Sequence, residues 1–139
     1  MKIMVSACLM GRNCKYNGGN NLNKKVMELS KGNEIIQVCP EEMGGLATPR
    51  VPSEIVNGRA MARDGHDVDS EFRSGAEKCL EIAEREKPDL IVLQSRSPSC
   101  GVNEIYDGTF TGSLIPGQGI TAKLLMQHGV HVIDVGACP

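Results

Sequence analysis

Four short runs of apolar and β-branched residues recur along the chain, at intervals long enough to hold a helix between them. They occupy residues 2–5, 34–38, 89–93 and 130–134. Such runs are typical of strands, and the densest of them suit a sheet that is covered on both faces. Because every gap has room for a crossover connection, the spacing predicts a mainly parallel sheet of about four strands.

Helices are expected in the gaps between these runs. Segment 70–86 carries its apolar side chains on one helical stripe, made of Phe72, Ala76, Cys79, Leu80 and Ala83. Segments 121–128 and 22–30 are further helices, each stopped near a glycine. The alternation predicts an α/β fold of the Rossmann-like or flavodoxin-like type, with three layers, in a single domain over residues 1–139.

Two glycine- and proline-marked segments, residues 44–52 and 106–119, are expected to be loops within that domain. Both are long for connections in a compact fold. Long loops of this kind often carry binding or catalytic residues, so their length suggests a functional role.

Composition and charge narrow the range of partners. The formal net charge of −2 gives no broad basic field, and only two Tyr, two Phe and no Trp offer rings for base stacking. We therefore expect no large nucleic acid as a partner. We also expect no membrane segment and a cytoplasmic location, because no long apolar stretch and no signal-peptide pattern is found.

Three of the six cysteines lie just beyond predicted strands. Cys8 comes three residues after the first run, Cys39 one residue after the second, and Cys100 seven residues after the third. The carboxyl ends of parallel strands share one edge of a sheet, so the three thiols are expected to meet there. In a reducing compartment such thiols are more often metal ligands or catalysts than disulfides. Three unrelated buried thiols are the other interpretation.

Three cysteines without an obvious fourth favour a catalytic centre. A 4Fe-4S cluster normally has four cysteine ligands, so three would leave one iron open to a substrate atom. Zinc bound by three cysteines and a water molecule is the alternative that the spacing leaves open.

The other cysteines are assigned lesser roles. Cys14 could be a fourth ligand, a reactive thiol or a structural loop residue, and the last is favoured. Cys79 falls on the apolar stripe of the predicted helix 70–86, which indicates core packing. Cys138 lies beside the last residue and is expected to have no role in the site.

A set of short motifs resembles one known family over nearly the whole chain, in that family's order. They are residues 6–9 (SACL), 14–18 (CKYNG), 39–41 (CPE), 44–46 (GGL), 49–50 (PR), 97–101 (SPSCG), 106–110 (YDGTF) and 117–122 (GQGITA). Through these motifs the chain resembles the thiouracil desulfidase family, formerly an uncharacterised bacterial domain family.

This resemblance implies a 4Fe-4S cluster held by Cys8, Cys39 and Cys100. It also implies an enzyme that removes sulfur from a small thiolated pyrimidine, such as 2-thiouracil, without net redox change. Glu41 and Ser99 match the family's catalytic positions. A carboxylate near the cluster can take a proton from water and return it to a ring nitrogen or to sulfur.

The chain departs from the family's usual residues beside the SPSCG motif. Family members commonly carry Lys where this chain has Gln94, and an acidic residue where it has Ser95. Asn17 also often appears as Asp.

Further residues are candidates for contact with the substrate. Arg50 and Arg96 flank two of the cysteine loops and could hold an anionic or carbonyl-bearing ligand. Ser97 and Asp107 are the other substrate-binding candidates, although an Asp-Gly pair is first a turn signal.

The alternative function is a non-catalytic metal-binding module (zinc or iron–sulfur) or a sulfur carrier. A carrier would need only exposed reactive thiols. The enzyme would also need Glu41 and a cavity large enough for a substrate.

Overall fold

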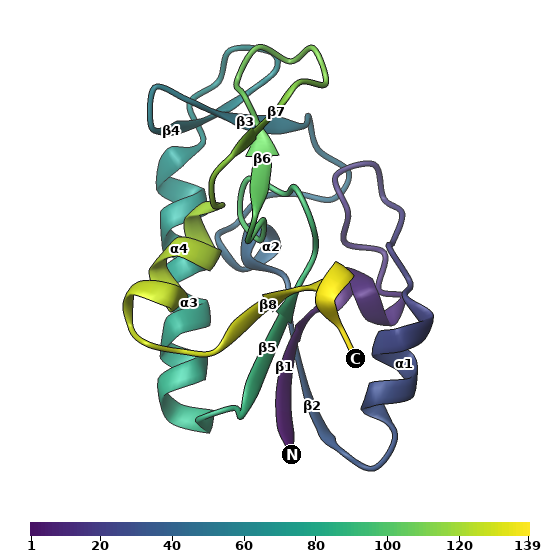
Figure 1. Ribbon diagram of the computed structural model, residues 1–139. Coiled ribbons are helices and arrows are strands. Elements are labelled where there is room, and N and C mark those ends of the chain that lie inside the picture. Colours follow the sequence, from purple (N-terminus) through teal and green to yellow (C-terminus); the bar gives the residue numbers. More distant parts are fainter.

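A parallel sheet forms the centre of the molecule. The computed structural model describes residues 1–139 and contains four parallel strands in the order β2-β1-β5-β8 (Figure 1). Their bounds are Lys2–Ser6 (β1), Glu34–Val38 (β2), Leu90–Leu93 (β5) and Val132–Asp134 (β8). All four strands that the sequence predicts are present, and the predicted α/β fold class is confirmed.

Helices cover both faces of this sheet. Helices α3 (Asp69–Glu86) and α4 (Ile120–Gln127) lie on one face, and α1 (Lys24–Ser30) lies on the other (Figure 1). Alternate strand residues therefore face two separate cores. Met4 belongs to the core that includes residues of α3 and α4, whereas Ile3 packs in the core that includes Val26 of α1. The predicted three-layer arrangement follows from this division.

The helix boundaries agree closely with those predicted. Helix α3 begins one residue before the predicted segment 70–86, and its stripe residues Phe72, Ala76, Cys79 and Ala83 are buried. Helix α1 begins after Asn23, whose side chain accepts a hydrogen bond from the backbone N–H of Val26 at 3.1 Å.

A one-turn helix, α2 (Pro40–Met43), is not predicted from the sequence and packs directly on α3. The contact is between backbones. A Cβ added to Gly75 would lie 1.9 Å from the carbonyl oxygen of Pro40, and one added to Gly44 would lie 1.9 Å from that of Glu71. Only glycine permits this approach. The contact fixes the turn that carries Glu41 against the long helix.

Two antiparallel hairpins lie beyond the carboxyl edge of the sheet (Figure 1). Their strands are Ser53–Val56 (β3), Arg59–Ala62 (β4), Glu104–Tyr106 (β6) and Leu114–Pro116 (β7). The prediction that 106–119 is entirely loop is therefore wrong, since β7 falls inside it. Strands of three or four residues are too short to give a periodic pattern, and a proline in a strand argues against one.

Two 3-10 turns complete the secondary structure. They are η1 (Ala7–Met10), which follows β1 directly, and η2 (Val135–Ala137), which follows β8. No helix of the structure combines the length and the apolar character that crossing a membrane requires.

Candidate functional site

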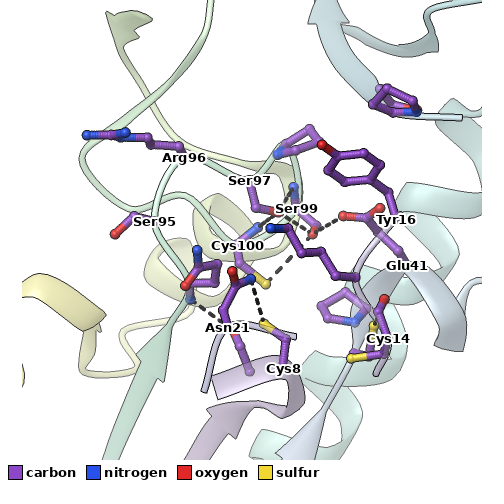
Figure 2. A pocket seen from close by; sticks show the side chains of 18 of the residues that line it. Cys8, Cys14, Tyr16, Asn21, Glu41, Ser95, Arg96, Ser97, Ser99 and Cys100 are labelled. Atoms are coloured by element: carbon purple, nitrogen blue, oxygen red, sulfur yellow. Dashed lines mark hydrogen bonds between the residues drawn. The ribbon is translucent and has the colours of Figure 1, made fainter. Parts of the chain in front are cut away.

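A cavity of about 680 Å³ opens between the carboxyl edge of the sheet and the two hairpins. It is lined by the segments that follow β1, β2 and β5 and by residues of the two hairpins. This is the edge at which ligands bind in parallel α/β sheets. Figure 2 shows side chains from these separate segments pointing into one space.

The three cysteines predicted to converge all line this cavity. Cys8 belongs to η1, Cys39 precedes α2, and Cys100 lies in the loop after β5. Cys79 and Cys138 are not among the lining residues, and both are buried. The strand-end positions of the three thiols therefore do bring them to one cavity.

Two of these sulfurs have polar neighbours. The side-chain amide of Asn21 donates a hydrogen bond to Sγ of Cys8 at 3.5 Å, and the hydroxyl oxygen of Ser99 lies 3.7 Å from Sγ of Cys100 (Figure 2). Burial raises the pKa of both thiols; the contact with Asn21 opposes the rise at Cys8, and contacts with Ser6 and then Ser99 oppose it at Cys100. A donor such as the Asn21 amide stabilises sulfur in its anionic or metal-bound form.

Cys14 also lines the cavity, and its position next to Cys39 is not expected from the sequence. The two sulfurs and a carboxylate oxygen of Glu42 all lie within 4.8 Å of one another. The contact with Cys14 lowers the pKa of Cys39, whereas the same contact and burial raise the pKa of Cys14. The site therefore holds one more thiol than the sequence interpretation assigned to it.

The carboxylate of Glu41 and the hydroxyl of Ser99 form a hydrogen-bonded pair beside the thiols. Ser99 Oγ donates to Oε2 of Glu41 at 2.9 Å, although the two residues are 58 positions apart (Figure 2). A hydroxyl has one hydrogen, so the hydroxyl of Ser97, 2.8 Å from Ser99 Oγ, must be the donor in that contact. Ser97 Oγ in turn accepts the backbone N–H groups of Ser99 and Cys100. The chain Ser97, Ser99, Glu41 thus has a defined direction.

Arg50 holds the other oxygen of this carboxylate. Its Nε donates to Oε1 of Glu41 at 3.0 Å, and its Nη2 donates to the carbonyl oxygen of Cys14 at 2.9 Å. Its Nη1 donates to the carbonyl oxygen of Ala47 and to the hydroxyl of Thr48. All three nitrogens therefore have partners within the protein. Arg50, a predicted substrate-binding residue, lines the cavity, and its contacts are those of a group that orients Glu41.

The remaining candidates are placed differently. Arg96 lines the cavity and donates to Glu104 at 3.3 Å. Asp107 is not among the lining residues. Its carboxylate accepts the backbone N–H and the hydroxyl of Thr109, so it caps a turn, as its Asp-Gly sequence also indicated.

Of the three residues that depart from the family's usual pattern, Gln94 and Ser95 line the cavity and Asn17 does not. The backbone N–H of Gln94 donates to the hydroxyl of Ser6 at 3.0 Å. The hydroxyl of Ser95 donates to a carboxylate oxygen of Asp134 at 3.0 Å. Neither contact involves the thiols.

The donor set fits an iron–sulfur cluster. Cys8, Cys39 and Cys100 come from three separate loops around one cavity, and thiolates are the ligands that iron–sulfur clusters use. In a cubane each cysteine binds a different iron, so the ligand sulfurs lie farther apart than those around a single ion. These three sulfurs are not all within 4.8 Å of one another, so they do not form a compact site for a single ion.

Fold and site together define a class of protein: an α/β domain with a thiol-lined cavity at the carboxyl edge of its sheet and a carboxylate–hydroxyl pair beside the sulfurs. Residues 3–135 match the family model described as 2-thiouracil desulfurase. The chain belongs to the 2-thiouracil desulfurase family, as its motifs indicated.

Two similar proteins extend this comparison. The uncharacterized protein YbbK of Bacillus subtilis (strain 168) is 39% identical over 142 residues, which cover 95% of this chain and 94% of that protein. The solved structure of the 4Fe-4S-dependent thiouracil desulfidase TudS is 38% identical and matches with a TM-score of 0.89, over 96% of this chain and 89% of that one. Both similarities run through nearly the full length.

Proposed function

We propose that this protein is an iron–sulfur-dependent desulfidase that acts on a small thiolated pyrimidine such as 2-thiouracil. The reaction is a hydrolysis, in which 2-thiouracil and water give uracil and hydrogen sulfide, with no change of oxidation state. We further propose that residues 1–139 act as one domain, in the cytoplasm.

The observation that carries this proposal is the Ser99–Glu41 hydrogen bond of 2.9 Å at the thiol-lined cavity. A metal carrier needs thiols but has no use for a carboxylate aligned by a serine and an arginine. A hydrolase needs such a group, because water must lose a proton as it attacks carbon. Membership of the family and the 38% identity to TudS support the same assignment.

Cys8, Cys39 and Cys100 are the residues that would hold the cluster. When bound by three cysteines, a 4Fe-4S cluster supplies one iron without a protein ligand, a Lewis acid suited to sulfur. The amide of Asn21 then remains as a donor beside this group.

Glu41 is the proposed general base and acid. Its two oxygens are fixed by different partners, Arg50 on Oε1 and Ser99 on Oε2, so the carboxylate has one orientation in the cavity. From there it can take a proton from water and return it to the leaving sulfur or to a ring nitrogen. Ser99 orients the water or the substrate, and Ser97 sets the direction in which Ser99 donates.

Anaerobic reconstitution with iron and sulfide, followed by an assay of uracil formation from 2-thiouracil, tests the proposal. A brown protein that produces uracil supports it. A brown protein that leaves 2-thiouracil intact contradicts the proposed substrate. A colourless protein after reconstitution contradicts the proposed cofactor.

One observation favours a second candidate, a zinc-binding module. The sulfurs of Cys14 and Cys39 and the carboxylate of Glu42 are close enough together to surround a single ion. However, the two oxygens of Glu42 already accept hydrogen bonds from Arg12 and Thr48. Metal analysis of the purified protein and of its Cys14→Ala variant distinguishes the two, since only a zinc site would be lost in the variant.

A further inference from the structure

Aromatic residues are rare in this chain and are concentrated at the cavity. The sequence has two Tyr, two Phe and no Trp. Three of the four rings, those of Tyr16, Tyr106 and Phe110, line the cavity, and only Phe72 lies in the core. A flat heterocycle presents a π-face to any ring beside it, so these rings are suited to bind one.

Phe110 has an unusual backbone conformation. Its φ of 59° lies in the left-handed region, which bulky side chains rarely adopt. Such a conformation persists only where the surrounding structure enforces it. The ring of Phe110 is thus directed by its neighbours and not by its own preference.

The carboxylate of Glu54 on β3 holds the backbone of this loop. Oε1 of Glu54 accepts the backbone N–H of Phe110 at 3.1 Å and that of Gly108 at 2.9 Å. Gly108 can approach because a Cβ there would lie only 2.5 Å from the carbonyl oxygen of Ile55. The carboxylate therefore ties the loop of the β6–β7 hairpin to the β3–β4 hairpin.

Glu54 has no part in the chemistry proposed above. Glu54 itself lines the cavity but is only 8% exposed, and its carboxylate forms no salt bridge with a Lys, Arg or His side chain. Its two backbone partners both belong to the loop that carries Phe110. A buried carboxylate used in this way positions a loop.

The ring of Phe110 also has a charged neighbour. The guanidinium carbon of Arg63 lies 5.9 Å from the ring centroid, within the range of a cation–π contact, and both side chains line the cavity. This contact joins β6–β7 to the segment after β4 and adds to the restraint on the ring.

We propose, resting on the desulfidase function above, that Phe110 is a substrate-specificity residue whose ring stacks on the pyrimidine, and that Glu54 is the positioning residue that holds it. The two hairpins then recognise the heterocycle, while the loops of the sheet provide the thiols and Glu41.

The test is steady-state desulfuration of 2-thiouracil by the reconstituted enzyme and its variants. Phe110→Ala should raise KM by about fivefold or more, the loss expected for one stacked ring, and leave kcat within about twofold. Glu54→Ala should raise KM in the same way. Glu54→Gln should restore the wild-type KM, because its amide oxygen still accepts both N–H groups. An unchanged KM in Phe110→Ala would overturn the inference.

A binding measurement separates this inference from the proposed function. The chain has no Trp, so Phe110→Trp creates a single reporter whose fluorescence a stacked pyrimidine should quench. Uracil and 2-thiouracil are the probes. Quenching by both with no uracil formed would refute the desulfidase and support the stacking, and uracil formed with no quenching by either would refute the stacking alone.

Folding controls accompany both measurements. Thr111→Ala changes the neighbouring residue in the same loop, which does not line the cavity, and should leave KM unchanged. Thermal melting checks each variant. If Glu54→Ala does not fold, Glu54→Gln still tests the positioning role. A KM raised in Glu54→Gln as much as in Phe110→Ala would show that the negative charge of Glu54, and not its hydrogen bonds to the loop, is needed, and would refute the positioning role.

Discussion

The pairing of Arg50 with Glu41 can be tested by a double-mutant cycle. The ion pair joins Nε of Arg50 to Oε1 of Glu41 at 3.0 Å, and the two side chains are only 10% and 16% exposed. Replacing Arg50 by Leu also removes its contacts with the carbonyl oxygens of Cys14 and Ala47 and with Thr48. The perturbation therefore acts on one nearly buried cluster of hydrogen bonds.

The burial of the pair sets the expected magnitude. Exposed ion pairs contribute about 0.2–1 kcal/mol, whereas breaking a buried one costs about 3–5 kcal/mol. Since this pair is close to the buried limit and Arg50 has further partners, Arg50→Leu should lower the free energy of unfolding by about 4 kcal/mol. The Arg50–Glu41 coupling itself should be about 2 kcal/mol.

Urea unfolding of the metal-free protein, followed by circular dichroism, measures the four corners of the cycle. These are the wild type, Arg50→Leu, Glu41→Ala and the double variant. Arg50→Lys is the matched control, because it keeps the charge but cannot form the fork of bonds to three partners. A coupling energy below about 0.5 kcal/mol would refute the view that Arg50 positions Glu41.

Four further outcomes are expected. Glu41→Gln should abolish uracil formation and keep the visible absorption of the cluster; full activity would exclude Glu41 as base. Cys100→Ala should prevent cluster uptake, measured as bound iron, whereas Cys79→Ala should not, and equal iron in both would contradict the ligand assignment. Gly75→Ala should lower the free energy of unfolding by about 3 kcal/mol or more in a urea titration, because the added Cβ would meet the carbonyl oxygen of Pro40. A change below about 1 kcal/mol would contradict the close contact between α2 and α3. In the metal-free protein, the rate of alkylation of Cys39, measured by mass spectrometry, should increase as the pH rises through its lowered pKa of about 7, because the thiolate is the form that reacts. A rate that stayed flat up to pH 9, the ordinary thiol pKa, would refute this.

The sheet and its main helices could be predicted because their patterns are long. Helix α3 repeats its apolar positions over 18 residues, and the central strands are almost wholly apolar. The hairpins could not be predicted, since three- or four-residue strands leave too little periodicity. The helix α2 is a single turn, and the backbone contact that secures it depends on Gly75, which lies 35 positions after Pro40.

The site could be predicted in part for the same reason. The convergence of Cys8, Cys39 and Cys100 follows from strand order, which the sequence does indicate. The position of Cys14 next to Cys39 depends on the path of a loop that no local pattern describes. The only sequence signal for a role of Cys14 in the site was its place in the CKYNG motif, which resembles the family's.

The two hairpins and the sheet contribute different parts of the cavity, and this division has an evolutionary consequence. The loops that follow the parallel strands carry the thiols. Two of the three aromatic side chains that line the cavity, Tyr106 and Phe110, belong to the β6–β7 hairpin. None of the three proposed thiol ligands lies in either hairpin. A library confined to residues 104–116 should therefore yield enzymes with altered preference among heterocycles that still load iron normally, which makes this scaffold a favourable starting point for directed evolution.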